Sequence, residues 1–191
     1  MDQSAEPLQQ VQLFGGAAEI AVPSRFEDVS NIRPVPDNQE VYSDASVDQS
    51  IVVEVVQVDV PDSDSCQHCF NDLANVSGAS MQQIESETVL NPQDIPGVPG
   101  EAYKVVIVGQ QMVSKGRQGT DAANRVIMAI IRLKQVSSDV LIILNTPISV
   151  SASSAAAKDI GPGERSEHLM APSLLRRVLA TFKIKDYSLF G

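Results

Sequence analysis

The stretch SIVVEVVQV, residues 50–58, is a nearly continuous apolar run of strand length. Its β-branched residues favour an extended backbone, and an apolar run without strict alternation is typical of a strand covered on both faces. Glu54 interrupts the middle of the run. An ionised carboxylate in a covered strand is costly unless it is paired or reaches water. Glu54 therefore marks either the point where the strand leaves the core or a carboxylate with a dedicated partner, inside or outside the protein.

Gln57 follows Glu54 by three positions. Successive side chains of a strand point to opposite faces, so the two residues would face opposite sides of a regular strand. A bulge or a strand end between them would be needed for both to contribute to one surface.

The residues before this strand predict a hairpin and then a polar segment. Two extended runs, residues 11–14 and 17–22, flank Gly15-Gly16, and glycine permits the positive φ of tight hairpin turns. We expect a flexible tail over residues 1–9, one helical turn near Ser30–Arg33, and an extended pattern again over residues 39–42.

The residues after the strand predict one helix, several strands and a closing helix. Residues 63–76 have apolar side chains at helical spacing, and strands are expected at 84–90, 102–115, 123–133 and 139–145. Residues 91–100 are rich in Pro and Gly and predict a connecting loop, and a mobile surface loop is expected over 147–165. Pro172 suits the first turn of the closing helix. Its inner stripe would consist of Leu175, Val178, Leu179 and Phe182.

Many strands in series, with helices in only a few places, predict a largely antiparallel sheet with helices packed on it. The length of 191 residues and the hydrophobic content of 43% suit one domain with a sizeable core. We therefore expect a single α+β domain over residues 1–191.

The charge is unevenly distributed along the chain. Residues 1–101 contain 18 acidic and two basic residues, whereas residues 102–191 contain six acidic and 12 basic residues, which gives the formal net charge of −10. This balance argues against nucleic acid as a partner, because phosphates require cations opposite them. Acidic residues can simply solvate one end of a protein, or they can form a surface that attracts a basic protein partner.

No apolar run approaches the roughly 20 residues that span a bilayer, and the first ten residues show no signal or transit pattern. Two cysteines in 191 residues do not form a secreted disulfide framework. We therefore expect a protein of the cytosol or nucleus that has no membrane partner.

Cys66-Gln67-His68-Cys69 resembles half of a zinc or redox site. A structural zinc site needs four ligands, and the chain's other histidine is His168, far away in the sequence. Both cysteines also lie on the apolar stripe of the predicted helix, and buried cysteine packs as a small hydrophobic residue. We interpret them as core residues and expect no metal and no cofactor.

No catalytic pattern is found in the sequence. The segment KGRQGT, residues 115–120, has its lysine before the glycines and precedes a predicted strand, so we interpret it as a hairpin loop and not a phosphate loop. Two histidines provide little general-base capacity near neutral pH. The sequence therefore predicts a protein that is not an enzyme.

The segment RPVPDNQE, residues 33–40, is the second notable feature. Pro34 and Pro36 fix their own φ angles and bias the residues before them towards extended conformations. A stiffened loop that presents four polar residues loses little entropy on binding. The alternative is an ordinary turn in which Asp37 and Asn38 bond their own backbone.

LFGGA at residues 13–17, RPVPDNQEV at 33–41 and DQSIVVE at 48–54, in this order and spacing, closely resemble the Ran guanine nucleotide release factor (Mog) family. The match continues more loosely through FNDL at 70–73, AIIRL at 129–133, DVL at 139–141, Asn145, Pro147 and SLFG at 188–191. The resemblance implies an α/β/α sandwich, in which helices flank both faces of a central antiparallel sheet, as in the PsbP proteins.

The resemblance also implies a function. It implies binding to the GTPase Ran, release of Ran's guanine nucleotide and support of nuclear protein import, and we expect a monomer of the nucleus and cytoplasm. It implies a Ran-binding surface with an acidic D/E-x-x-E pair, of which this chain has Glu54 and, in the second position, the amide Gln57. The other expected contact residues are Arg33, Asp37, Asn38, Gln39 and Glu40. Because Gln57 removes one charge, a Ran-binding or scaffold protein with little release activity is the alternative.

Overall fold

A computed structural model describes residues 6–57, 59–115, 120–149 and 171–191. Its main element is a seven-stranded sheet with the strand order β3-β4-β5-β9-β8-β7-β6, in which neighbouring strands pair antiparallel. The strands are β3 (Glu27–Asp28), β4 (Gln39–Asp44), β5 (Gln49–Val56), β6 (Ala79–Val89), β7 (Tyr103–Lys115), β8 (Thr120–Leu133) and β9 (Ser138–Ser149). A smaller sheet has the order β1-β2-β10, formed by Leu8–Leu13, Ala18–Pro23 and Lys183–Ile184.

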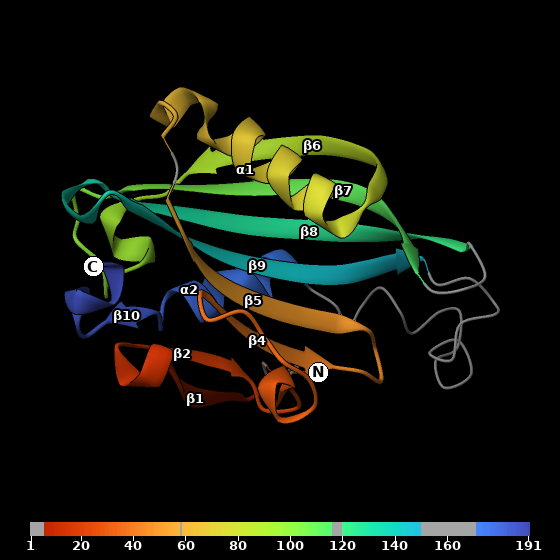
Figure 1. Cartoon of the computed structure of the whole chain (residues 1–191), viewed down its shortest axis with the longest axis horizontal. Coiled ribbons are helices and arrows are strands. Elements are labelled where there is room, and N and C mark those ends of the chain that lie inside the picture. The colour runs from red at the N-terminus through yellow and green to blue at the C-terminus, as the bar shows by residue number, and fades with distance from the viewer. Residues whose placement is uncertain (1–5, 58, 116–119, 150–170) are drawn as a thin grey trace, which may run out of the picture.

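The large sheet is covered on its two faces by different elements. Helix α1 (Asp62–Ser77) lies over β6, β7 and β8 on one face, whereas the small sheet and helix α2 (Ala171–Leu179) pack on the other (Figure 1). This arrangement confirms the predicted α/β/α sandwich with a central antiparallel sheet. No helix in the described part of the chain is long and apolar enough to cross a membrane.

The strand alternation divides the core between the two faces. On β5, Ile51 and Val53 are fully buried towards α2 and the small sheet, whereas Val52, Glu54 and Val56 lie on the α1 side and are half-buried. The prediction that this strand is covered on both faces is therefore wrong for its α1 side, because α1 covers β6 to β8 and leaves β5 partly open.

Helix α1 comes very close to the sheet at Gly109 in β7. A Cβ atom on Gly109 would lie 2.5 Å from Phe70 Cζ, so a larger residue there would push the helix away. Of the five buried residues of α1, Cys66, Cys69 and Phe70 belong to the hydrophobic cluster between the helix and the sheet. The position of α1 over this side of the sheet is thus set by close packing.

Most expected elements are present, with shifted bounds. The hairpin of β1 and β2 turns through Phe14–Gly16, where Phe14, Gly15 and Gly16 all have positive φ. The helical turn lies at Val29–Asn31, and α2 buries Leu175, Val178 and Leu179 as predicted, while Phe182 is buried just beyond its end. Strand β6 begins five residues before the predicted one.

The tail and the loops that the sequence predicts lie only partly within the residues that the structure describes. Strand β1 begins at Leu8 and β9 ends at Ser149, so the tail predicted for 1–9 and the loop predicted for 147–165 each contain strand residues. The pairing of β7 with β8 extends to Lys115 and Thr120, as a hairpin requires. Residues 1–5, 116–119 and 150–170 lie outside the described residues.

Candidate partner-binding surface

The two notable sequence features meet in the structure. Strand β4 pairs with β5 in a register that places Gln39 opposite Glu54, and the Val55 amide donates to the Asn38 carbonyl at 2.9 Å. The polar segment at 33–40 therefore runs directly into the strand that lies beside the charged position of β5. Sequence spacing alone did not reveal that the two features share one surface.

Two amide side chains hold the Glu54 carboxylate. Glu54 Oε1 accepts a hydrogen bond from Gln39 Nε2 at 3.0 Å and another from Asn38 Nδ2 at 3.3 Å. Asn38 Nδ2 also donates to the Val55 carbonyl at 3.1 Å. No ion pair to Glu54 is found within the described ranges, so the bonds shown orient the carboxylate without neutralising its charge. Of the two interpretations of Glu54, these hydrogen bonds support a carboxylate with dedicated partners inside the protein, Asn38 and Gln39.

The segment before β4 is closed by backbone bonds. The Gln39 amide donates to the Pro36 carbonyl at 2.9 Å, which forms a turn over residues 36–39. Asn38 directs its side chain to β5, not to its own turn. Arg33, Asp37 and Asn38 are exposed, so this turn presents charged and amide groups to solvent next to Glu54.

Glu40 has a different role from its neighbours. Its Oε1 atom accepts a hydrogen bond from the Phe14 amide at 2.6 Å. Phe14 has a φ of 50°, and this left-handed backbone begins the turn of the β1–β2 hairpin. Glu40 thus ties the LFGG turn at residues 13–16 to β4. This bond was not predicted, because nothing in the sequence pairs a carboxylate with a backbone amide 26 residues away.

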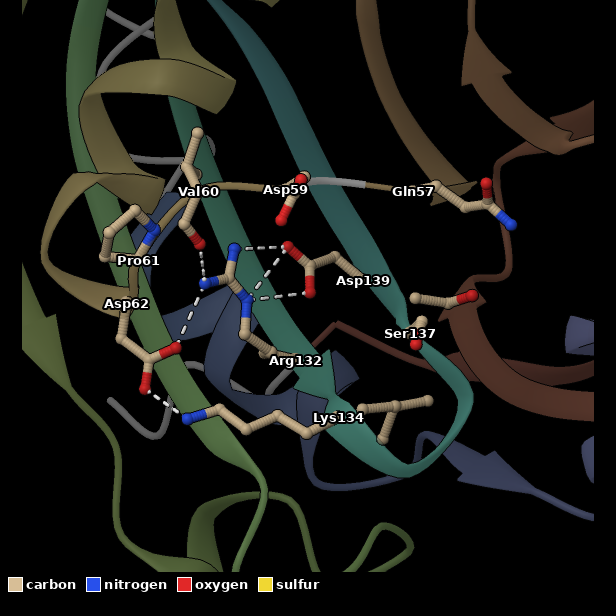
Figure 2. A pocket seen from close by; sticks show the side chains of 11 residues that line it. Gln57, Asp59, Val60, Pro61, Asp62, Arg132, Lys134, Ser137 and Asp139 are labelled. Atoms are coloured by element: carbon tan, nitrogen blue, oxygen red, sulfur yellow. Dashed lines mark hydrogen bonds and ion pairs between the residues drawn. The ribbon is translucent and has the colours of Figure 1, made fainter.

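Gln57 lies one residue beyond the end of β5 and is exposed. Strand β5 thus ends between Glu54 and Gln57, as would be needed for both side chains to contribute to one surface. However, Gln57 lines a hollow of about 880 Å³ together with Asp59, Asp62, Arg132, Lys134 and Ser137. Figure 2 shows its side chain directed away from the charged groups at the other side of this hollow. No bond between Gln57 and Glu54 is found in the described part of the chain.

A buried ion-pair network forms the wall of the hollow (Figure 2). Arg132 in β8 lies opposite Asp139 in β9 and donates to both carboxylate oxygens, with Arg132 Nη2 to Asp139 Oδ2 at 2.9 Å. Arg132 Nη1 also donates to the Val60 carbonyl at 2.7 Å and to Asp62 Oδ1 at 3.0 Å. The hydrogen bonds with Asp139 raise the pKa of Arg132 above its usual value. The network joins the start of α1 to the centre of the sheet.

Asp62 also binds a second cation. Lys134 Nζ donates to Asp62 Oδ2 at 2.7 Å, and this bond, with the contribution of Arg132, lowers the pKa of Asp62 below its usual value. Sequence reasoning missed the whole network. A signal was available, since Asp139 is the one charged residue of its apolar strand and Arg132 lies near the end of the preceding strand, at positions that a short connection would pair.

Cys66 and Cys69 are both buried between α1 and the sheet, as predicted for core residues. Burial raises the pKa of the Cys66 thiol to about 11 and that of Cys69 to about 12. Both side chains therefore stay protonated at neutral pH. A protonated thiol is a poor nucleophile and a poor metal ligand, because the thiolate is the reactive form.

The acidic and basic halves of the sequence are partly interleaved in space. Lys185 pairs with Glu19, Arg125 with Glu85, and Arg132 and Lys134 with Asp62. Each of these pairs joins a basic residue of the second half to an acidic residue of the first. Basic residues of the second half therefore offset part of the negative charge of the first half in the folded protein.

Comparisons with known proteins agree with this architecture. The family described as Ran-interacting Mog1 protein matches residues 11–147. A Dictyostelium discoideum protein named "Probable ran guanine nucleotide release factor" is 32% identical over 97% of this chain and 98% of its own length. The Homo sapiens Ran guanine nucleotide release factor is 34% identical over 82% of this chain and 86% of its own.

Solved structures show the same fold. The Saccharomyces cerevisiae Ran-binding protein Mog1p superimposes with a TM-score of 0.70 at 26% identity, covering 98% of this chain and 100% of that one. A cyanobacterial PsbP protein from Synechocystis reaches a TM-score of 0.57 at 11% identity, which shows a shared fold alone.

Proposed function

Because this chain belongs to the Ran-interacting Mog1 protein family, we propose that it binds the small GTPase Ran, promotes release of Ran's guanine nucleotide and supports nuclear protein import. The observation that carries the proposal is the family match over residues 11–147 together with relatives named as Ran guanine nucleotide release factors. The surface around Glu54 is the site that we propose for this interaction.

The proposed Ran-binding surface consists of Arg33, Asp37, Asn38, Gln39 and Glu54. Asn38 and Gln39 hold the Glu54 carboxylate in place through neutral donors, so its charge is available to a cation or a hydrogen-bond donor of Ran. Preorganised charged groups at a desolvated interface form strong contacts, because little entropy is lost in ordering them. Glu40 supports this surface from the other side by fixing the hairpin turn.

Nucleotide release in this proposal requires no covalent chemistry. A protein that binds nucleotide-free Ran more tightly than loaded Ran weakens the affinity of Ran for nucleotide by the same factor, since the two equilibria are linked. The factor thus acts as a binding protein, not as an enzyme. We infer that it works as a monomer, in the nucleus and cytoplasm, and that its formal net charge of −10 disfavours nucleic acid as a partner.

A Ran-binding or scaffold protein with little release activity is the second candidate. It is favoured by Gln57, an amide at a position where the resemblance implies a carboxylate. Two observations weaken this argument. Gln57 lines the hollow, and the Glu54 carboxylate is oriented by Asn38 and Gln39, not by Gln57. Asp37 and Glu40 moreover have the D-x-x-E spacing with both carboxylates present.

The test is to mix the protein with Ran loaded with a fluorescent guanine nucleotide and to follow the loss of fluorescence. Accelerated release is the expected result. Binding in a pull-down without acceleration would favour the scaffold function, and absence of both binding and release would overturn the proposal.

A further inference from the structure

Ile32 exposes 73% of its side-chain and backbone surface, immediately before the segment at 33–40. Single exposed aliphatic residues are common in proteins, and their exposure alone indicates nothing. Val76, Met81 and Val89 are similarly exposed elsewhere on the molecule. What distinguishes Ile32 is the backbone that carries it and the residues beside it.

The backbone around Ile32 is fixed by several bonds. Asp28 caps the turn at Val29–Asn31 by accepting from the Ser30 amide at 2.8 Å, and Val29 is buried in the core. The Ile32 and Arg33 amides both donate to the Val29 carbonyl, at 2.9 and 3.0 Å. Strand β3, just before this turn, pairs with β4. Ile32 is therefore presented from an ordered backbone, which reduces the entropy lost on binding.

The residues that follow Ile32 combine apolar and polar surface. Pro34 and Pro36 add exposed apolar surface. Arg33 before them, and Asp37 and Asn38 after them, add exposed polar side chains. Exposed apolar surface bordered by polar side chains matches the composition of protein interfaces, in which an apolar core is surrounded by a polar rim. The segment is also continuous with Glu54, because Asn38 bonds to β5.

We propose that Ile32 is an apolar anchor of the Ran interface, inserted into an apolar depression on Ran while Glu54 and Asp37 make the polar contacts. This inference rests on the proposed function and adds the residue that excludes water from the contact. Ran is the expected occupant, and not a second copy of this chain, because the exposed segment leads without interruption into the proposed Ran-binding surface.

The test is the affinity of full-length Ile32→Ser for nucleotide-free Ran, compared with wild type and with Val76→Ser. Val76 in α1 is 80% exposed and lies outside the proposed surface, so it is a matched control for the loss of an exposed branched side chain. Burying an aliphatic side chain of this size stabilises a complex enough that Ile32→Ser should bind Ran about tenfold more weakly or worse. Ile32→Leu should keep most of the affinity, and Val76→Ser should bind as wild type does.

Wild-type affinity in Ile32→Ser, or an equal loss in Val76→Ser, would overturn the inference while leaving the proposed function intact. A wild-type dimer in solution that Ile32→Ser converts to monomer would overturn it in favour of a second copy. Failure of the wild-type protein to bind Ran would instead contradict the proposed function itself. Thermal unfolding of each variant, expected to match wild type, shows that the measured affinities belong to folded protein.

Discussion

Asp139 and Glu54 lie on neighbouring strands and on the same face of the sheet, yet their surroundings differ completely. Asp139 is opposite Val56 of β5, two positions from Glu54. Its side chain is 3% exposed and bonded at both oxygens by Arg132, whose side chain is 7% exposed. Glu54 is half-buried and receives its hydrogen bonds from Gln39 and Asn38, which carry no charge.

The difference indicates two roles for a carboxylate in an apolar strand. A buried carboxylate with a bidentate arginine is satisfied inside the protein, and it contributes to the structure by fixing neighbouring elements. A half-buried carboxylate oriented by amides keeps its charge for an external partner. The Arg132 network, which ends at α1, therefore belongs to the scaffold, and the Glu54 cluster, which α1 leaves open, belongs to the proposed interface.

The largest expected effect is on stability, from Arg132→Met. This change leaves Asp139 buried without its cation, and breaking a buried ion pair in this way costs about 3–5 kcal/mol. Urea unfolding followed by fluorescence or circular dichroism would measure it. The double variant Arg132→Met with Asp139→Leu should recover most of the lost free energy of unfolding. If the single variant is as stable as wild type, the distinction between the two carboxylates fails.

A smaller loss of stability is expected for Cys66→Ala with Cys69→Ala. Both side chains pack between α1 and the sheet, and their truncation leaves small cavities that should lower the free energy of unfolding by about 1–3 kcal/mol in total. Ran binding by the folded double variant should be unchanged, because the proposed surface lies on β4, β5 and the segment before β4, not on α1. A specific loss of Ran binding, or stoichiometric zinc in the purified protein, would contradict the core role of these cysteines.

The smallest expected effect is that of Asp62→Asn. The lowered pKa of Asp62 means that its ion pairs stabilise the fold above its ordinary pKa of 3.8, and that this contribution disappears as the pH falls through the lowered pKa. Asp62 is about one-third exposed, so solvent screening limits the loss at pH 7 to roughly 1 kcal/mol or less. The stability difference between wild type and variant should be constant above about pH 5 and shrink towards pH 3. A difference that grows on acidification would be inconsistent with this assignment.

The sequence predicted the order of elements well, because apolar periodicity and turn residues are local signals. The sequence did not predict which side chains meet across neighbouring strands, because such contacts depend on strand register and on helix packing. The meeting of Asn38 and Gln39 with Glu54 depends on the register of β4 and β5, and the half-open side of β5 depends on where α1 packs. Glu54 was recognised as unusual from local sequence alone, because a charge in an apolar strand needs an explanation. Gln57 is linked to Glu54 by its spacing and by the D/E-x-x-E pair that the resemblance implies, and neither shows which way a side chain points beyond a strand end.

The most direct test of the central claim is to measure Ran-nucleotide release and thermal unfolding on the same Glu54→Gln protein. This variant keeps the shape of the side chain and removes its charge. The account predicts normal unfolding and a weaker complex, by about 2–5 kcal/mol for the loss of a charged contact at a desolvated interface, with correspondingly slower nucleotide release at limiting protein concentration. Wild-type release by a normally folded Glu54→Gln protein would remove Glu54 from the Ran-binding surface and contradict the account.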